Sequence, residues 1–357
     1  MPRTLEGADV LILGGTGSLG QRLFRRILSG ELGAPGSLTV FSRDEAKQHY
    51  MRLAFLQQAS ATDDIIYRES VQRVRFAIGD VRNYAEVKRS ADRADVIFHA
   101  AALKQVPTCE YFGAAAVDTN IMGAVNLARA LRDGAQREKS VVGISTDKAC
   151  KPVNLMGMTK AIQERILVQA NLDSPWVRFV NVRYGNVMAS RGSAIPFFID
   201  RVRSGRPIPI TDWRMTRFLM TLDESVDLIF NALRLASPGE TWLPRIPSAL
   251  VTDMARAVAG DEEYPLELTG IRPGEKIHEI LLSEEEVAHS ERRGENLVIL
   301  PILPELRRPG AAAEPLPFAG EYSSADDNLT YHEVRELLLR YGLTAETAER
   351  DAQEIYR

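Results

Sequence analysis

Short apolar runs alternate with longer helix-patterned stretches from residue 8 to about residue 186. Between the first two runs, Leu19, Leu23 and Ile27 recur at a spacing of four residues, which is typical of an amphipathic helix. Such alternation predicts βαβ units around a parallel sheet. We therefore expect an α/β fold, a Rossmann-type doubly wound parallel sheet. The runs that predict its strands are 10–13, 38–41, 74–78, 96–99, 141–145 and 179–183.

The pattern changes beyond residue 187, where the alternation weakens, prolines become frequent and helical patches alternate with loops. This part, residues 187–357, is expected to form mainly a smaller mixed α/β substrate-binding lobe, with some segments that return to the first domain. Residues 301–320 contain five prolines and predict an irregular path over the surface. Thr330 and Glu333 then form a capping box before apolar positions, which predicts a C-terminal amphipathic helix.

Charge and composition exclude several classes of partner. The chain has 357 residues, with Lys+Arg 44 against Asp+Glu 48 and a net charge of −4, whereas binding to nucleic acid needs a basic excess. The apolar stretches are shorter than the ~18 residues of a spanning helix. The first predicted strand begins too early for a signal peptide. We expect a cytoplasmic protein without nucleic-acid or membrane partners.

The cysteines and histidines offer no metal or disulfide framework. Cys109 and Cys150 form no C-x-x-C pair, and the five histidines lack the spacing of metal ligands. We therefore expect reduced thiols and no metal site.

A glycine loop joins the first predicted strand to the first predicted helix. Its sequence is G-x-x-G-x-x-G, in which glycines permit a tight turn and let a pyrophosphate approach the N–H groups at the helix N-terminus. A glycine-rich turn without a ligand is the alternative, but the flanking strand and helix favour a dinucleotide site. The expected cofactor contacts are Gly14, Thr16, Gly17, Ser18, Leu19 and Gly20.

The end of the second predicted strand bears on the choice of cofactor. Ser42 and Arg43 stand where a carboxylate would select the ribose of NAD, and Lys47 follows one helical turn later. These residues favour the 2′-phosphate of NADP, although Asp44 could cap the next helix or still serve NAD. We thus predict that residues 1–186 form an NADP-binding domain.

Two later strand ends carry further cofactor-like sequences. Asp80 and Val81 suit contacts to an adenine ring, and Ala100 and Ala101 leave room for a ribose. We expect His99 to be a buried histidine satisfied by the backbone rather than a catalytic residue.

Candidate catalytic residues lie at and after the end of the fifth predicted strand. Thr146, Asp147 and Lys148 end this strand, and Lys160 follows twelve residues after Lys148. Together they resemble the active-site region of extended short-chain dehydrogenases/reductases, most of which use Tyr-x-x-x-Lys. Met156 stands at the tyrosine position here, and methionine cannot transfer a proton.

Further motifs narrow the resemblance to one subfamily, the inverting UDP-N-acetylglucosamine 4,6-dehydratases, especially the 4,6-dehydratase/5-epimerases of capsule and O-antigen synthesis. Methionine commonly replaces the tyrosine in this subfamily. The resemblance covers roughly residues 8–345. The motifs that carry it lie at 99–110, 145–148, 154–157, 183–193, 215–218, 272–276 and 321–324.

The resemblance implies a redox-neutral lyase reaction in which NADP takes hydride from carbon 4 of the sugar and returns it to carbon 6. Lys148 would remove the carbon 5 proton, Asp147 would protonate the departing hydroxide, and Thr146 would bind the 4-hydroxyl. Desolvation and the nicotinamide cation are both expected to lower the pKa of Lys148. Either Asp147 or a water beside Thr146 would replace the tyrosine. A surface ion pair is the alternative for Asp147 and Lys148.

The same resemblance implies the other ligand contacts. Lys160 and Tyr184 would hold the cofactor, and the arginines would meet the diphosphate with their planar forks. Cys109 would either approach the sugar or be a buried inert thiol. The expected substrate-binding residues are Lys104, Cys109, Asn186, Val187, Arg217, Arg272 and Glu275.

Three segments depart from the subfamily pattern, namely Phe112-Gly113, 212–214 and 242–247. We expect them in or near the parts that face the sugar or nucleotide, so another UDP-sugar remains an alternative substrate. A nucleotide-sugar epimerase and a non-catalytic NADP-binding regulator remain alternative functions. Resemblance also implies a homo-oligomer, a dimer or a hexamer.

Overall fold

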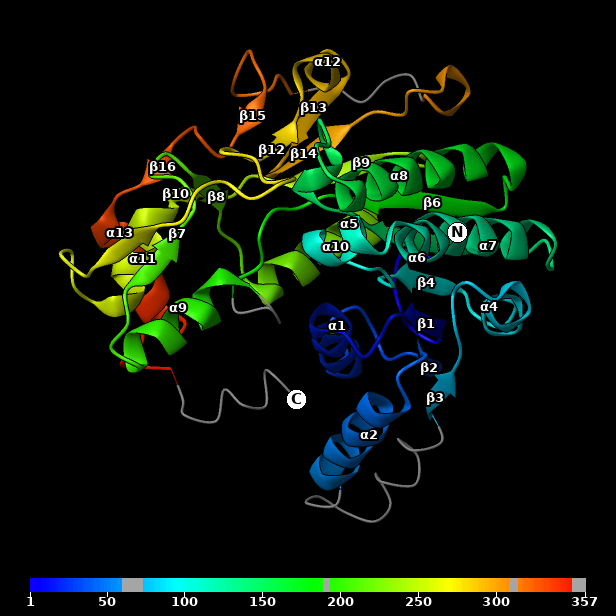
Figure 1. Ribbon diagram of the computed structural model, residues 1–357. Coiled ribbons are helices and arrows are strands. Elements are labelled where there is room, and N and C mark those ends of the chain that lie inside the picture. Colours follow the sequence, from blue (N-terminus) through cyan, green and yellow to red (C-terminus); the bar gives the residue numbers. More distant parts are fainter. Residues whose placement is uncertain (60–72, 189–192, 308–313, 349–357) are drawn as a thin grey trace.

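The computed structural model describes residues 1–59, 73–188, 193–307 and 314–348. Within them, nine strands form one large sheet in the order β13-β14-β9-β6-β5-β4-β1-β2-β3 (Figure 1). The strands from β3 to β6 are parallel, and their order 3-2-1-4-5-6 is that of a Rossmann fold. The predicted fold class is confirmed. The strands are β1 (Asp9–Leu13), β2 (Ser37–Ser42), β3 (Val74–Ile78), β4 (Val96–His99), β5 (Lys139–Ile144), β6 (Val177–Val182), β9 (Thr241–Pro244), β13 (Ser290–Arg293) and β14 (Asn296–Ile299).

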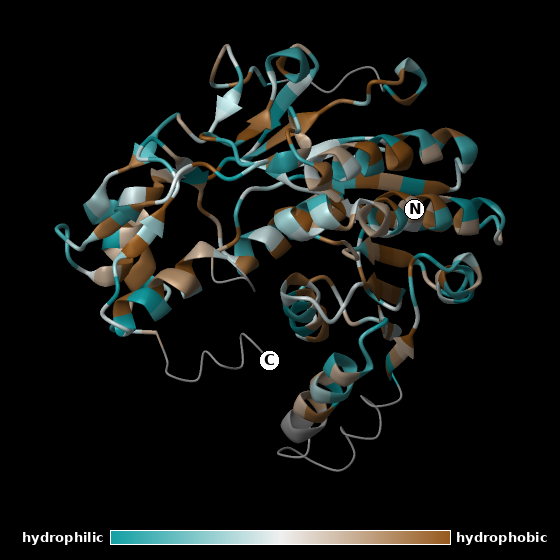
Figure 2. Cartoon of the chain, viewed as in Figure 1, coloured by the Kyte–Doolittle hydropathy of each residue, from teal (hydrophilic) through white to brown (hydrophobic). Residues whose placement is uncertain are grey.

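Helices cover both faces of this sheet, and each face has its own core. On one face Val10 and Ile12 of β1 belong to a buried cluster that includes residues of α1 and α10. On the other face Leu11 and Leu13 belong to a cluster that includes residues of α4, α7 and α8. Figure 2 shows these apolar strands in the interior of the molecule. The helices are α1 (Ser18–Leu28), α2 (Glu45–Ala59), α4 (Tyr84–Ala91), α5 (Val106–Tyr111), α6 (Gly113–Ala116), the π-helical η1 (Val117–Met122), α7 (Gly123–Arg132), the 3₁₀ turn η2 (Asp147–Ala149), α8 (Leu155–Asp173) and α10 (Leu222–Leu235).

A smaller lobe lies on the left in Figure 1, with a separate core between α9, α11 and α13. The predicted capping box is confirmed, because Thr330 and Glu333 exchange hydrogen bonds at the start of α13. Three strands from this half of the sequence, β9, β13 and β14, join the large sheet beside β6. The division at residue 186 stays a prediction. The remaining elements are α9 (Ala194–Arg203), α11 (Val251–Ala259), α12 (Glu284–Val287), η3 (Pro304–Leu306), α13 (Tyr331–Arg340), β7 (Ile208–Ile210), β8 (Thr216–Phe218), β10 (Ser248–Leu250), β11 (Leu266–Leu268), β12 (Ile280–Leu282), β15 (Tyr322–Ser323) and β16 (Asn328–Leu329).

Strands β5 and β6 each begin two residues before the predicted start, at positions where charged side chains hide the strand pattern. Lys139 is buried and donates to the carbonyl oxygens of three residues near the end of α4. Arg178 is also buried and donates to carbonyl oxygens of Pro2, Leu233 and Ala236. Carbonyl partners offset the cost of burying these charges, and a hydrophobicity pattern cannot show such partners.

No helix among the described residues has both the length and the apolar character to span a membrane.

Candidate active site

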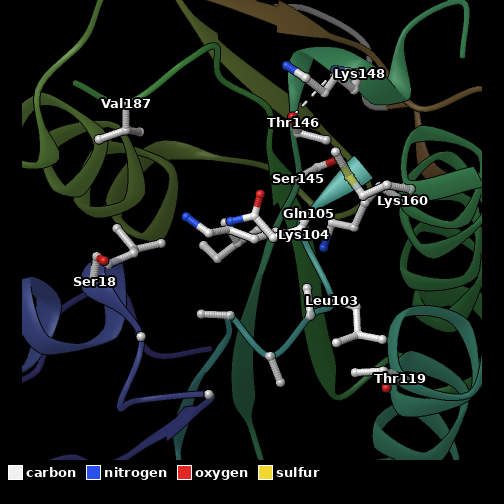
Figure 3. Close-up of a pocket in the computed structure, with 18 of the residues that line it drawn as sticks. Ser18, Leu103, Lys104, Gln105, Thr119, Ser145, Thr146, Lys148, Lys160 and Val187 are labelled. Atoms are coloured by element: carbon white, nitrogen blue, oxygen red, sulfur yellow. Dashed lines mark hydrogen bonds between the residues drawn. The ribbon is translucent and has the colours of Figure 1, made fainter. Parts of the chain in front are cut away.

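A cavity of about 690 Å³ lies along the carboxyl edge of the parallel strands. Ligands of such sheets bind at this edge, where the strand order reverses between β1 and β4. All the predicted cofactor residues line the cavity, as do the predicted catalytic residues and every predicted substrate residue except Cys109. In Figure 3, Ser18 and Val187 stand on one side, Lys160 and Thr119 on the other, and Thr146 and Lys148 at the upper end.

The glycine loop fits the phosphates of a dinucleotide. Gly14 has a φ of +82°, and a Cβ there would lie 2.6 Å from the Cα atom of Ala101, so only glycine allows β1 and β4 to meet here. Gly17 caps α1 without a side-chain hydrogen bond, and the first turn has no acidic residue. The N–H groups of α1 and its positive dipole end therefore face the cavity without a competing anion from the first turn.

The ribose end of the site contains both cations and carboxylates. Arg43 is about half exposed and pairs with Asp80 only at 3.9 Å, whereas Asp80 holds Arg82 at 2.6 Å. Lys47 forms an ion pair with Asp44. Asp44 also accepts the Lys47 backbone N–H at 3.0 Å, so it caps α2, one of the two roles predicted for it. The Ser42 hydroxyl lies 2.8 Å from that of Thr16.

At the opposite end, η2 directs three adjacent side chains toward the cavity. Thr146 caps this turn and donates to the Oδ1 atom of Asp147 over 2.7 Å. Lys148 Nζ lies 3.1 Å from the same oxygen. Asp147 is fully buried, so the pair is not the surface ion pair of the alternative interpretation. Burial raises the pKa of the Asp147 carboxyl, which favours its protonated form.

The structure contradicts the expected direction of the Lys148 pKa. Burial alone would lower this pKa, but the carboxylates of Asp147 and Glu279 together raise it. Glu279 Oε1 lies 3.3 Å from Lys148 Nζ. Sequence reasoning missed Glu279, although it follows the 272–276 motif by only three residues. Its approach to Lys148 is a tertiary contact with no local signal.

Helix α8 presents Met156 and Lys160 to the cavity. Met156 is buried and packs with Cys109 and Ala116, so the position normally held by a tyrosine hydroxyl is apolar. Lys160 Nζ donates to Gln163 over 2.6 Å, and burial lowers its pKa to about 7. Gly157 brings the start of α8 against η2, because a Cβ there would lie 2.1 Å from the Lys148 carbonyl oxygen.

Two sequence expectations need correction. Cys109 is fully buried behind the cavity wall, its thiol bonds to the Leu103 carbonyl oxygen, and burial raises its pKa. It is therefore the inert thiol of the two alternatives. His99 is buried as expected, but neither ring nitrogen has a hydrogen-bond partner among the described residues. Burial, with a contribution from Lys160, lowers the pKa of His99 to about 3, so the ring is neutral.

The substrate side contains fixed cations and unpartnered acceptors. Arg217 donates to three backbone carbonyls, which hold its guanidinium at the cavity wall, while Arg272 is 63% exposed. Asn186 Oδ1, Asp147 Oδ2 and Glu279 Oε2 are buried without hydrogen-bond partners among the described residues. Buried polar atoms are rarely left unpaired, so this wall suits a ligand rich in hydroxyl and amide groups.

The three segments that depart from the subfamily pattern lie away from this wall. Phe112 and Trp213 are exposed outside the cavity, and Trp242 is fully buried in β9. None of the residues in these three segments lines the cavity, and their expected position in or near the parts that face the sugar or nucleotide stays a prediction. Part of the motif at 183–193, residues 189–192, lies outside the described residues.

Comparison with known proteins agrees with this architecture. A family model described as polysaccharide biosynthesis protein matches residues 10–301. The chain therefore belongs to this family. It is 39% identical over 291 residues to a UDP-glucose 4-epimerase of Rickettsia bellii, with 80% of each chain covered. The UDP-glucose 4-epimerase of Rickettsia typhi is 38% identical over 290 residues, with the same coverage.

The chain is also similar in structure to solved proteins. The X-ray structure of Pen from Bacillus thuringiensis has a TM-score of 0.83 and 32% identity, covering 95% of this chain and 99% of that one. DesIV from Streptomyces venezuelae, a dTDP-glucose 4,6-dehydratase with NAD and TYD bound, has a TM-score of 0.63 and 19% identity, covering 75% and 86%. The second likeness shows the shared fold alone.

Proposed function

We propose that the protein is an NADP-dependent 4,6-dehydratase of UDP-N-acetylglucosamine that inverts carbon 5 and yields a UDP-2-acetamido-2,6-dideoxy-4-hexulose for polysaccharide or specialised sugar biosynthesis. The observation that carries this proposal is the pair of a buried Asp147 and a part-buried Lys148 in a cavity where Met156 replaces a proton-transferring tyrosine. Elimination of water needs an acid and a base together, and this pair offers one of each. Oxidation at carbon 4 alone would have no use for both.

Each group near η2 has a role in this reaction. A bound nicotinamide would supply hydride transfer from carbon 4 of the sugar and back to carbon 6. Lys148 removes the proton from carbon 5, and Asp147 gives its proton to the hydroxide that leaves carbon 6 as water. After the return of hydride to carbon 6, carbon 5 takes up a proton that derives from solvent, and inversion requires this proton to arrive on the face opposite to the one that lost it. Thr146 binds the 4-hydroxyl. The proton of that hydroxyl passes either to Asp147, which Thr146 contacts at 2.7 Å, or to a water beside Thr146.

A 4-epimerase is the second candidate, because the curated relatives at 38–39% identity carry that name. An epimerase moves hydride from and to carbon 4 only, so it needs a group that takes and returns the 4-hydroxyl proton. Met156 cannot do this, and Thr146 with Asp147 would have to replace the tyrosine. Lys148 would then have no proton to transfer.

Proton NMR of the protein incubated with UDP-N-acetylglucosamine in deuterated water separates these candidates. A 6-deoxy-4-keto sugar with deuterium at carbon 5 and the L-arabino coupling pattern is the expected product. A 4-epimeric sugar that keeps its carbon 6 hydroxyl would contradict the dehydratase proposal. An unchanged spectrum would reject UDP-N-acetylglucosamine as the substrate and lead to other UDP- and dTDP-sugars.

The Lys148→Ala variant tests the base directly. It should lose turnover by about 10²–10⁴-fold, because general base catalysis contributes on that scale. NADP binding, measured by fluorescence titration, should remain, since the cofactor contacts predicted for the glycine loop lie at the other end of the cavity. Unchanged turnover would reject Lys148 as the base.

We also propose that NADP is favoured over NAD and that the chain forms a homo-oligomer. Arg43 supports the first, because its long contact with Asp80 leaves its guanidinium able to reach a 2′-phosphate. Exposed apolar side chains on neighbouring helices support the second, since surfaces of this kind mark protein interfaces. They are Tyr111, Val117, Met122, Met158 and Ile162, on α5, η1 and α8.

A further inference from the structure

One amine and two carboxylates form a compact cluster at the catalytic end of the cavity. Lys148 Nζ lies 3.1 Å from Asp147 Oδ1 and 3.3 Å from Glu279 Oε1. Asp147 precedes Lys148 in η2, whereas Glu279 arrives from the other half of the sequence, directly before β12. The cluster therefore joins the strand-end turn of the Rossmann sheet to the segment that begins the β12–β15 pair.

The backbone fixes the position of Glu279. Its N–H donates to Ser324 Oγ over 2.9 Å, and its carbonyl oxygen accepts from the Ser324 N–H over 2.8 Å. The Glu279 side chain is 3% exposed. A carboxylate held this rigidly and shielded from water acts strongly on neighbouring charges, because the local dielectric constant is low.

Two other charged groups face the cluster. Arg217 Nε lies 3.9 Å from Glu279 Oε1, and the charge of Lys276 also acts on Glu279. Lys276 Nζ itself donates to the Cys150 carbonyl oxygen over 2.6 Å. Burial alone would raise the pKa of Glu279, but Lys148, Arg217 and Lys276 together lower it, so Glu279 is the ionised carboxylate of the cluster. Burial and the charge of Glu279 raise the pKa of Asp147 despite the opposing effect of Lys148.

An ionised Glu279 beside a protonated Asp147 suits the elimination step of the proposed function. The inference rests on that proposed function. Elimination begins with Lys148 neutral and Asp147 protonated. It ends with the carbon 5 proton on Lys148 and the Asp147 proton on the departing water. The pair thus holds one proton before and after the step, and the 3.1 Å contact lets that proton redistribute between the two groups. We propose that Glu279 is a positioning residue that keeps this single proton on the Asp147–Lys148 pair and orients the lysine amine beside the sugar.

The Glu279→Gln variant removes the charge but keeps the size and an oxygen that can accept from Lys148. The pH profile of kcat/KM for dehydration should move to lower pH by about 1 to 3 units, the usual effect of a nearby charge on a pKa. Glu279→Asp keeps the charge and should restore the profile toward that of the parent protein. The matched control is Glu285→Gln, because Glu285 is exposed, lies outside the cavity and accepts a hydrogen bond from Ser283. This control should leave the profile unchanged.

A second measurement does not depend on turnover. The ¹³Cε resonance of Lys148, assigned with Lys148→Arg, reports the pKa of its amine in labelled protein without substrate. This pKa should fall in Glu279→Gln and stay constant in Glu285→Gln. An unchanged Lys148 titration would overturn the inference even where dehydration is observed.

The two measurements also distinguish a failure of the proposed function from a failure of the inference about Glu279. If the parent protein dehydrates no UDP-sugar but the Lys148 pKa falls in Glu279→Gln, the proposed function is wrong while the charge effect of Glu279 stands. If Glu279→Gln does not fold, the uncharged variant Glu279→Ala decides: the Lys148 pKa should fall in it, and no fall would overturn the inference.

Discussion

Thr146 donates a hydrogen bond to Asp147 over 2.7 Å, so a hydroxyl that lines the cavity is linked directly to a fully buried carboxylate. In the proposed reaction, this link would give the 4-hydroxyl of the sugar a short route to a proton acceptor in the absence of a tyrosine. It also orients Oδ1 toward Lys148 Nζ, leaving Oδ2 without a partner among the described residues.

Thr146→Val should reduce turnover by about 10²-fold or more, because it removes the hydroxyl and keeps the side-chain shape. Thr146→Ser keeps the hydroxyl and should retain most of the activity. Steady-state kinetics with saturating NADP measures both variants. Retained activity in Thr146→Val together with a loss in Thr146→Ser would show that the methyl group, and not the hydroxyl, is required.

Met156→Leu should change turnover by no more than a few-fold. Met156 lies in an apolar cluster with Cys109 and Ala116, and a swap of similar volume costs less than about 1.5 kcal/mol. Met156→Ala opens a cavity there and should lower the free energy of unfolding by about 2 to 5 kcal/mol. Steady-state kinetics measures the turnover of both variants, and denaturant unfolding measures their free energy of unfolding. A large loss of activity in the stably folded leucine variant would assign the thioether a chemical role.

Arg183→Met should destabilise the fold by about 3 to 5 kcal/mol, since it leaves the buried carboxylate of Glu164 and the part-buried carboxylate of Glu286 without their cation. Arg183 donates to both carboxylates, so Arg183→Lys should restore only part of the loss. Thermal unfolding measures the effect. The control Arg214→Met removes an exposed arginine that pairs with Asp212 and should have almost no effect.

The same cluster predicts a pH dependence. Burial alone would raise the pKa of Glu286, but Arg183 and hydrogen bonds lower it below its value in the unfolded chain. A depressed carboxyl pKa contributes stability above the unfolded value of about 4.3, and that contribution is lost as pH falls through the folded pKa. The parent protein should therefore lose stability more steeply below pH 4 than Glu286→Gln. Parallel curves of unfolding free energy against pH would contradict this.

Arg43→Ala should weaken NADP binding by about 10- to 100-fold, the worth of a hydrogen bond to a charged group, and leave NAD binding almost unchanged. Arg75→Ala is the control, because Arg75 is exposed on β3 outside the cavity. Fluorescence titration with each cofactor gives the dissociation constants. An equal effect on NAD and NADP would reject a 2′-phosphate contact.

Ile162→Glu should lower the molar mass of the particle in light scattering, because a charge on the apolar face of α8 opposes association. Met158 lies one turn earlier on the same helix and is also exposed. Leu235→Glu, at the end of α10, is a matched exposed control. An unchanged mass in Ile162→Glu would place the interface elsewhere or show a monomer.

The sequence by itself determined the order of strands and helices from β1 to β6, the glycine loop at the start of α1 and the cap of α13. Each of these depends on residues close together in the chain, such as the apolar spacing of Leu19 to Ile27 or the pair Thr330 and Glu333. Local periodicity and capping chemistry are visible without a fold. Most predicted site residues line one cavity, because they follow parallel strands whose carboxyl ends lie at the same edge of the sheet.

Only the tertiary structure decided which groups touch. It brought Glu279 to Lys148 and so reversed the expected pKa direction, and it withdrew Cys109 from the cavity wall. It also extended β5 and β6 through Lys139 and Arg178, whose charges find carbonyl partners far away in the sequence. Contacts between distant segments depend on how whole elements pack, and the free energy of a buried charge depends on all its neighbours at once.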